Sequence, residues 1–346
     1  MSDKLTKQPK ILALCTVSTG LDSISEVLRS GYKIISIIGV SPLAERLDLI
    51  SGWVDIAIFS KKWDVPYGYV NKYALKDISD RKLFESFNFD LIWVVGWQRL
   101  IPKWLIESAS LGALGGHGSP DGIHRGRGRS PQNWSIMLGC KQFNLALFFI
   151  TTGIDDGPII LQRSFTYNYM DDISVSYKKS ALAMGDMVCQ VLKNKDLLNH
   201  SVKQSKKAFY YPQRKPKDGF VDWNMKQKEI WSHCRALTRP YPGLRTGHQS
   251  SIIIIVWECQ PFDDIVDGEY GTISVCFESE EFLVNCADGR LLIKEWESCG
   301  SEWAPKQGIR FNSMPFYKQL QIIINRHKEK YPTLELDARI KKKAKV

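Results

Sequence analysis

The sequence predicts an α/β protein: a mostly parallel, Rossmann-like sheet followed by a small OB-like β-barrel domain. Three observations support this prediction. Strand-like and helix-like stretches alternate through the first half of the chain. The strand-like stretches are apolar along their whole length, and short strands separated by turn residues replace them beyond about residue 245. A chain of 346 residues is long enough for two domains.

Apolar runs in the first half predict buried strands of a parallel sheet that helices cover on both faces. The predicted strands are 11–15, 32–40, 55–59, 90–97 and 145–150, and the predicted helices run from the Thr19-Gly20 turn to Arg29 and over 77–87. Ligands of such sheets bind beyond the carboxyl ends of the strands. We therefore expect chemistry in the turns after Trp97 and Leu114.

A long helix is predicted over 173–193, and the composition of the chain changes after it. Residues 195–215 are polar and basic and should contain the link between domains. Short strands are predicted at 251–257, 271–276, 282–286 and 290–296. We therefore expect an α/β domain over 1–200, a β domain over 201–305, and a helical extension with a basic tail over 306–346.

The charge of the chain favours an anionic ligand. The net charge is +10, and residues 326–346 contain eight Lys or Arg against three Asp or Glu, which is half of that excess. Such a charge run predicts a solvated, mobile tail. The remaining excess is spread over the body, which suits a nucleotide or a polyglutamylated folate.

The composition also predicts a cytoplasmic protein without a metal site. No apolar run approaches the roughly 18–20 residues that cross a bilayer, and the N-terminal residues are polar. None of the eight cysteines is at C-x-x-C spacing with another, so they predict reduced thiols rather than a disulfide framework or a zinc site.

One glycine-rich stretch contains the first candidate for chemistry. His117 lies in Gly112-Ala113-Leu114-Gly115-Gly116-His117-Gly118-Ser119-Pro120, shortly after a predicted strand, and the basic stretch 125–134 follows it. Glycines allow a ligand to approach the backbone closely. A histidine in a loop is more often incidental than catalytic, so this stretch alone does not decide the function.

A second stretch adds a carboxylate. Asp155 and Asp156 lie in the turn Gly153-Ile154-Asp155-Asp156-Gly157, which follows the predicted strand 145–150. The plain interpretation is a solvated turn. A carboxylate beside a histidine, however, orients the ring and raises its basicity, as general acid–base catalysis requires.

Together these stretches resemble the folate-dependent formyltransferase family. The family pattern is Asn-x-His-x-Ser, then a loop with Arg-Gly, Pro and Trp, then Asp-x-Gly about 20 residues on. His117, Ser119, Arg127-Gly128, Pro131, Trp134 and Asp155-Asp156-Gly157 follow that order, with Arg125-Gly126 as the other possible match for the Arg-Gly pair. The resemblance covers about residues 11–300.

The resemblance implies roles for individual residues. It makes His117 the base and Asp155 its partner, with 10-formyltetrahydrofolate as the formyl donor and no metal. It assigns Ser119, Arg127, Arg129 and Trp134 to the substrate, with guanidinium groups paired to nucleotide phosphates. It also assigns residues to folate binding, most of them in one turn that follows a predicted strand. The residues in that turn are Gly96, Trp97, Gln98, Arg99, Leu100 and Ile101, and the others are Gly116 and Asp156.

The second domain narrows the resemblance to two branches. The stretches 211–223 and 235–243 resemble the start of the C-terminal domain in methionyl-tRNA and amino-sugar formyltransferases. Arg-Pro-Tyr-Pro-Gly at 239–243 is closer to the amino-sugar branch. That branch implies a nucleotide-linked amino sugar of O-antigen or lipopolysaccharide biosynthesis as the acceptor. An interdomain anchor that contacts no ligand is an equally good interpretation of this second stretch.

The chain departs from the family at one position. The family asparagine, two residues before the histidine, is Gly115 here. Loss of a donor to a developing oxyanion typically costs roughly 2.7–4 kcal/mol. The backbone N–H groups of Gly115 and Gly116, the side chain of Asn144, or protonated His117 are candidate replacements.

Three functions therefore remain open. The first is an N-formyltransferase for a nucleotide-linked amino sugar. The second is a methionyl-tRNA formyltransferase, which the basic tail favours slightly. The third is a non-catalytic homologue that binds folate or a sugar nucleotide. The sequence decides neither the sugar and nucleotide nor whether the chain forms a homodimer.

Overall fold

The computed structural model describes residues 8–344 except Arg46, Asp48, Leu49, Ser51, Gln249, Ser250, Ser251 and Ser301. The chain divides into two compact units. Unit 1 comprises Met1–Arg127, Phe143–Phe165 and Tyr177–Lys207, and unit 2 comprises Gly128–Gln142, Thr166–Ser176 and Ala208–Val346. The sequence-based domain bounds of 1–200, 201–305 and 306–346 stay a prediction.

Unit 1 is built on a sheet of seven strands, with the strand order β3-β2-β1-β4-β5-β7-β8. Its strands are β1 (Ile11–Leu14), β2 (Ile34–Val40), β3 (Tyr67–Val70), β4 (Leu91–Val94), β5 (Ala113–Ser119), β7 (Gln142–Phe149) and β8 (Ile159–Thr166). The first five strands pair in parallel, whereas β5 and β7 are antiparallel. The predicted mostly parallel α/β sheet is therefore confirmed, with one half more mixed than expected.

The order of the strands creates a switch point beside β1. The chain proceeds from β1 to β2 and β3 on one side and then to β4 and β5 on the other. The turns after β1 and β4 meet there, because Thr16 Oγ1 donates to the carbonyl of Gly96 at 2.7 Å. Such points are where open α/β sheets bind ligands.

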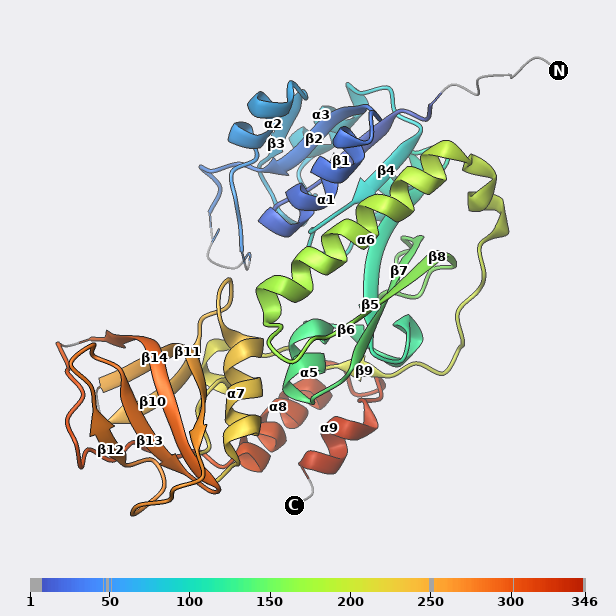
Figure 1. Ribbon diagram of the computed structural model, residues 1–346. Coiled ribbons are helices and arrows are strands. Elements are labelled where there is room, and N and C mark those ends of the chain that lie inside the picture. The colour runs from blue at the N-terminus through green and yellow to red at the C-terminus, as the bar shows by residue number, and fades with distance from the viewer. Residues whose placement is uncertain are drawn as a thin grey trace. The chain divides into compact units, whose positions relative to one another are not determined.

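Helices cover the sheet of unit 1 on both faces (Figure 1). Their bounds are α1 (Ser18–Arg29), α2 (Ala57–Trp63), α3 (Ile78–Glu85), α4 (Lys103–Glu107) and α6 (Ile173–Lys193). Leu14 and Val94 share an apolar core with Phe84 of α3 and Leu105 of α4. On the other face Lys178 of α6 lies 2.6 Å from the carboxylate of an α1 residue, Asp22.

One predicted strand was wrong. Residues 55–59 were expected to be the third strand, but helix α2 begins at Ala57, and the third strand is Tyr67–Val70. Asp55 favours the helical turn locally, because its carboxylate accepts the backbone N–H of Ala57 at 2.9 Å just before the helix. Strand β3 is short and partly exposed, and therefore lacks an apolar run.

Unit 2 contains an antiparallel five-stranded sheet with the order β10-β11-β14-β13-β12. Its strands are β10 (Leu244–His248), β11 (Ile252–Asp263), β12 (Ile273–Cys276), β13 (Phe282–Cys286) and β14 (Gly289–Cys299). The segment that contains Arg310 and Asn312 pairs with both edges of this sheet. Asn312 pairs with Gly247 of the edge strand β10, and Arg310 pairs with Thr272, which directly precedes the other edge strand, β12. This double pairing gives the sheet the barrel-like character that the sequence predicts.

The helices of unit 2 include two in the basic C-terminal region. The helices are α5 (Pro131–Met137), α7 (Gln227–Leu237), α8 (Phe316–Lys330) and α9 (Ala338–Lys343), and the last two lie in the basic C-terminal region. The expected mobile tail is therefore wrong as far as residue 344. Ile340 is fully buried, and Arg326 forms an ion pair with the buried carboxylate of Asp218. Apolar burial and this ion pair hold the basic segment to the fold.

Candidate functional site

The side chain of His117 lies between two polar groups in unit 1. Residues alternate between the faces of a strand, so His117 shares a face of β5 with Gly115 and Ser119. Its Nε2 lies 2.8 Å from the carbonyl oxygen of Gly126, and its Nδ1 lies 3.7 Å from Oδ2 of Asp155. The two side chains are 12% and 24% exposed, so solvent or a small ligand can reach the pair.

These contacts assign the protons of the ring. A carbonyl oxygen only accepts, so Nε2 donates to Gly126 and carries a proton. Nδ1 is then the atom that can take up or release a proton, directly beside the Asp155 carboxylate. The pair can therefore hold a proton at Nδ1 and stabilise the resulting cation.

The turn that contains Asp155 is held by several side chains. Asp155 has a left-handed backbone with φ of 49°. Gln204 donates to the carbonyl oxygens of Asp155 and Gly157 at 3.0 and 2.7 Å. Asp156 accepts from the hydroxyl of Thr151, so this carboxylate serves the turn.

Gly115 lies where a side chain would collide with a neighbour. A Cβ on Gly115 would lie 2.3 Å from Cδ1 of Ile150, so Ile150 fills the space that an asparagine would enter. The strand pairs at Gly115 with Val94 on one side and Phe148 on the other, so its backbone groups belong to the sheet. Another proposed donor is also engaged, since Asn144 donates to a carbonyl oxygen and accepts from a serine hydroxyl.

Gly116 faces the opposite side of the sheet from His117. A Cβ there would lie 2.2 Å from Cε of Met184 in α6. Only glycine therefore fits between β5 and this helix without a shift of the methionine.

The predicted folate turn leaves β4 at the switch point. Gly96 has φ of 84°, which favours glycine, and the N–H of Gln98 donates to the hydroxyl of Tyr73 at 2.6 Å. Leu100 is 56% exposed. Within the part of the chain that the structure describes, the backbones of Leu100 and Ile101 make no hydrogen bond. Those backbone groups fit a heteroaromatic ligand with donors and acceptors along its edge.

The other turn residues have mixed surroundings. Trp97 is 8% exposed and packs on Tyr73 with ring centroids 4.9 Å apart. The guanidinium of Arg99 lies 5.0 Å from the centroid of the Tyr73 ring on this exposed part of the turn. The turn thus offers an aromatic and cationic rim beside its backbone groups.

The predicted substrate residues divide between the two units. In unit 1, Ser119 is fully buried, and its hydroxyl donates to the carbonyl of Gly122 at 2.7 Å. The Arg127 side chain is 6% exposed and donates to Oε1 of Gln204 at 2.9 Å. Both side chains hold the loop around His117 in this structure.

Trp134 and Arg129 belong to unit 2. Trp134 is fully buried, its Nε1 donates to the carbonyl of Pro212 at 3.0 Å, and its ring stacks on Tyr211. The backbone N–H of Arg129 donates to Tyr211 at 3.2 Å. The buried indole has no face available for a ligand here, so its role in the fold is structural, while its predicted substrate role stays untested.

Gln204 is the neighbour of the site that the sequence did not indicate. It lies in the polar stretch predicted as a link, and no motif distinguishes it from the other polar residues there. Its contacts reach residues 77 and 49 positions away in the chain, which single-sequence patterns do not encode.

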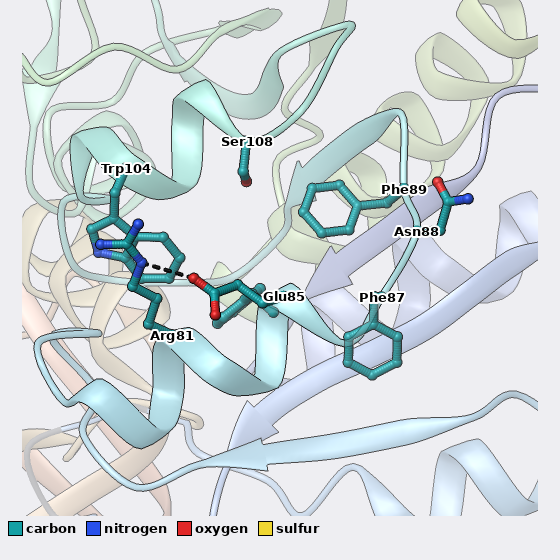
Figure 2. A pocket seen from close by; sticks show the side chains of 8 residues that line it. Arg81, Glu85, Phe87, Asn88, Phe89, Trp104 and Ser108 are labelled. Atoms are coloured by element: carbon teal, nitrogen blue, oxygen red, sulfur yellow. Dashed lines mark hydrogen bonds and ion pairs between the residues drawn. The ribbon is translucent and has the colours of Figure 1, made fainter.

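A cavity of about 300 Å³ lies elsewhere in unit 1, at helices α3 and α4. Figure 2 shows Arg81 and Glu85 of α3 beside it, with Trp104 and Ser108 from the α4 region. None of the predicted site residues lines this cavity. Within the described residues, no group of three or more His, Cys, Asp or Glu side chains is placed to hold a metal ion, and no helix suits a membrane span.

Comparison with protein families finds two matching models. The model described as formyl transferase matches residues 61–192, and the model described as formyl transferase, C-terminal domain, matches residues 214–306. Together they cover most of the chain, in the order that the sequence resemblance predicts.

Curated relatives are similar over part of their length. The bifunctional polymyxin resistance protein ArnA of Wigglesworthia glossinidia brevipalpis is 27% identical over 284 residues, which is 80% of this chain and 41% of that protein. Methionyl-tRNA formyltransferase of Pelobacter propionicus is 27% identical over 218 residues, or 62% of this chain and 65% of the enzyme. The chain thus covers less than two thirds of each of these two relatives.

Solved structures share the fold. HypX from Aquifex aeolicus, in complex with tetrahydrofolic acid, has a TM-score of 0.59 at 16% identity, covering 96% of this chain and 49% of HypX. An N-formyltransferase from Helicobacter canadensis, in complex with folinic acid and dTDP-3-aminofucose, has a TM-score of 0.55 at 15% identity, covering 82% and 98%. At these identities the likeness concerns the fold alone.

Proposed function

This chain belongs to the formyl transferase family, and from that premise we propose that it transfers a formyl group from 10-formyltetrahydrofolate to the amine of a nucleotide-linked amino sugar. The observation that carries this proposal is the His117–Asp155 pair, a partly exposed proton-accepting site on β5. The solved N-formyltransferase that holds a sugar nucleotide supports the choice of acceptor.

The folate would supply an activated formyl carbon, whose bond to the folate nitrogen is exchanged for a bond to the amine. Within the chain, Nδ1 of His117 takes the amine proton and returns it to the departing nitrogen. Asp155 stabilises the cation between these two steps. The Gly126 carbonyl keeps the ring oriented through Nε2.

The turn 96–101 is the part of unit 1 that would hold the folate. The unpaired backbone groups of Leu100 and Ile101 suit the edge of a pterin, and Tyr73 keeps the turn in place through Gln98. Gly115 and Asn144 are engaged within the fold. The donor that we propose for the oxyanion is therefore the His117 cation that forms once Nδ1 has taken the amine proton. Arg129 remains our candidate for a nucleotide phosphate.

The test combines the purified protein with 10-formyltetrahydrofolate and a panel of amino-sugar nucleotides. We expect release of tetrahydrofolate with at least one acceptor, and loss of that release in His117→Ala. If no acceptor releases tetrahydrofolate and the variant behaves like the wild type, the proposal is wrong.

Methionyl-tRNA is the second candidate acceptor. Enzymes of that name are among the relatives of this chain, and its net charge of +10 suits a polyanion. This alternative predicts tRNA binding that weakens steeply as salt rises. Absence of measurable tRNA binding at low salt would remove it.

A non-catalytic binding homologue is the third candidate, because Gly115 replaces the family asparagine. The test is the double variant Gly115→Asn with Ile150→Val, since valine lacks the Cδ1 atom that would collide with the new side chain. A large gain from near-zero activity supports this alternative. A wild type that already turns over refutes it.

A further inference from the structure

One amide side chain connects the two turns on either side of the His117–Asp155 pair. Nε2 of Gln204 donates to the carbonyl oxygens of Asp155 and Gly157, at 3.0 and 2.7 Å. Its Oε1 accepts from Nη2 and Nε of Arg127, at 2.9 and 3.3 Å. Gln204 thus contacts the Asp155 turn and the loop around His117 at the same time.

The chemistry of the partners fixes the orientation of this amide. A guanidinium only donates and a carbonyl oxygen only accepts, so the amide oxygen must face Arg127 and its nitrogen must face the Asp155 turn. Both polar ends of Gln204 are therefore used. Arg127 is 6% exposed, and its positive charge strengthens the bond to the amide oxygen.

Together with the contacts of His117, these hydrogen bonds form a closed ring of contacts around the His117–Asp155 pair. Arg127 directly follows Gly126, whose carbonyl accepts from Nε2 of His117 at 2.8 Å. Nδ1 of the same ring lies 3.7 Å from Asp155, whose own backbone carbonyl accepts from Gln204. A shift of Gln204 would therefore alter the relative position of both side chains.

The Asp155 turn needs such support. A non-glycine residue at φ of 49° adopts a conformation that only persists when surrounding contacts hold it. The segment before Gln204 is itself fixed, because Val202 and Ile159 exchange two backbone hydrogen bonds at 2.7 and 2.8 Å. Gln204 is therefore anchored well enough to hold the turn.

We propose that Gln204 is a positioning residue, which sets the distance and orientation between His117 and Asp155 through Arg127 and the Asp155 turn. This inference rests on the proposed formyl transfer. We call the hydrogen bonds that Gln204 makes with Arg127, Asp155 and Gly157 the brace. Arg127 then acts within the brace rather than at a substrate phosphate.

The kinetic test uses Gln204→Ala and Gln204→Glu. Glutamate keeps the size of the side chain and an acceptor for Arg127, but at neutral pH it cannot donate to the two carbonyl oxygens. We expect kcat for tetrahydrofolate release to fall about a hundredfold in both variants, as for a small misplacement of catalytic groups, with KM for the folate little changed. Gln190→Ala is the matched control, because it also removes a glutamine side chain of unit 1, whose amide donates an exposed hydrogen bond to Asp186 on α6.

A second readout needs no folate. Hydrogen–deuterium exchange at backbone amides 153–157 should become about tenfold faster in both Gln204 variants, because lost hydrogen bonds make the turn open more often. Gln190→Ala should leave these amides unchanged. If Gln204→Ala does not fold, Gln204→Glu alone decides the question.

The outcomes separate the two proposals. A wild type without formyl transfer ends the proposed function, while faster exchange in the variants would still support the brace. An active wild type whose Gln204 variants match Gln190→Ala in kcat and exchange overturns the brace. A fall in kcat without faster exchange also overturns it, because Gln204 would then act other than by holding the turn.

Discussion

Two histidines of this chain, one in each unit, lie in opposite environments. His117 is partly exposed and contacts a carbonyl oxygen and a carboxylate. His233, on α7, is 4% exposed, its Nε2 has no hydrogen-bond partner among the described residues, and its ring packs against Phe316 at 4.4 Å. Burial, with Arg214 and Lys343 nearby, lowers the pKa of His233 well below its ordinary value of 6.5.

The difference shows what separates a candidate catalytic histidine from a structural one. His117 has a carboxylate beside Nδ1, and it is open enough to meet a substrate. His233 is kept neutral by burial and by neighbouring cations, so it contributes packing rather than proton transfer. Four predictions, from the largest expected effect to the smallest, test this comparison.

Removal of the two rings should have opposite consequences for activity. His117→Ala should lower kcat/KM for tetrahydrofolate release about 10²- to 10⁴-fold, because it removes the general base. His233→Phe should leave kcat/KM close to that of the wild type. Steady-state rates measured on both purified variants check this, and equal losses in the two would end the distinction between them.

Removal of the Asp155 carboxylate should have the next largest effect on activity. Asp155→Asn keeps the size of the side chain but removes the charge beside Nδ1. We expect kcat to fall about a hundredfold, because the cation of His117 is no longer stabilised. Circular dichroism should show an unchanged fold. Full activity in this variant would mean that His117 works without a partner.

Gly115→Asn should lower stability, because Gly115 lies at a buried position of β5. The new Cβ would lie 2.3 Å from Cδ1 of Ile150, so the packing must shift, at a cost of about 2 kcal/mol in the free energy of unfolding. Adding Ile150→Val should recover most of that loss. Urea unfolding of the single and double variants measures it, and an undiminished stability in Gly115→Asn would show that Ile150 moves freely.

His233 should make stability depend on pH. Its folded pKa lies below the unfolded value of about 6.5, so the unfolded chain binds the extra proton, and stability falls as pH drops from 6.5 toward the folded pKa. The slope approaches about 1.4 kcal/mol per pH unit. Melting curves at pH 5–8 should be flatter in His233→Phe than in the wild type, and identical slopes would contradict this account.

Much of the fold was predictable because its signals are local. Apolar runs and helical spacing predicted β1, β2, β4, β7 and α6, and also β11, β12, β13 and β14 in the second half, whereas β10 was missed. Strand 55–59 was wrong because a short apolar run does not distinguish a strand from the start of a helix, and Asp55 accepts the backbone N–H of Ala57 where α2 begins. Helix α7 was missed, although its apolar residues gather on one buried face, because most of it falls between the two stretches, 211–223 and 235–243, that were interpreted through the resemblance.

The candidate site divides in the same way. The pairing of His117 with Asp155 was predicted from their places after strands of one sheet together with the family resemblance, and the two side chains do lie 3.7 Å apart. The position of the turn 96–101 after a buried strand was also predictable, while its role in folate binding comes from the resemblance and stays a prediction. The assignments of Ser119 and Trp134 to the substrate depend on the resemblance, and their burial is a property of packing that a motif does not contain.

The sequence by itself determined the family and the α/β class, because these depend on residue type and short-range order, and it supplied His117 and Asp155 as the candidate pair. Only the tertiary structure decided that Ile150 fills the space beside Gly115 and that Gln204 connects the turns around the pair. Those contacts join segments that are distant in the chain. They form only when the sheet brings the strands together, because side-chain packing and hydrogen bonding act over a few ångströms in space, whatever the separation in sequence.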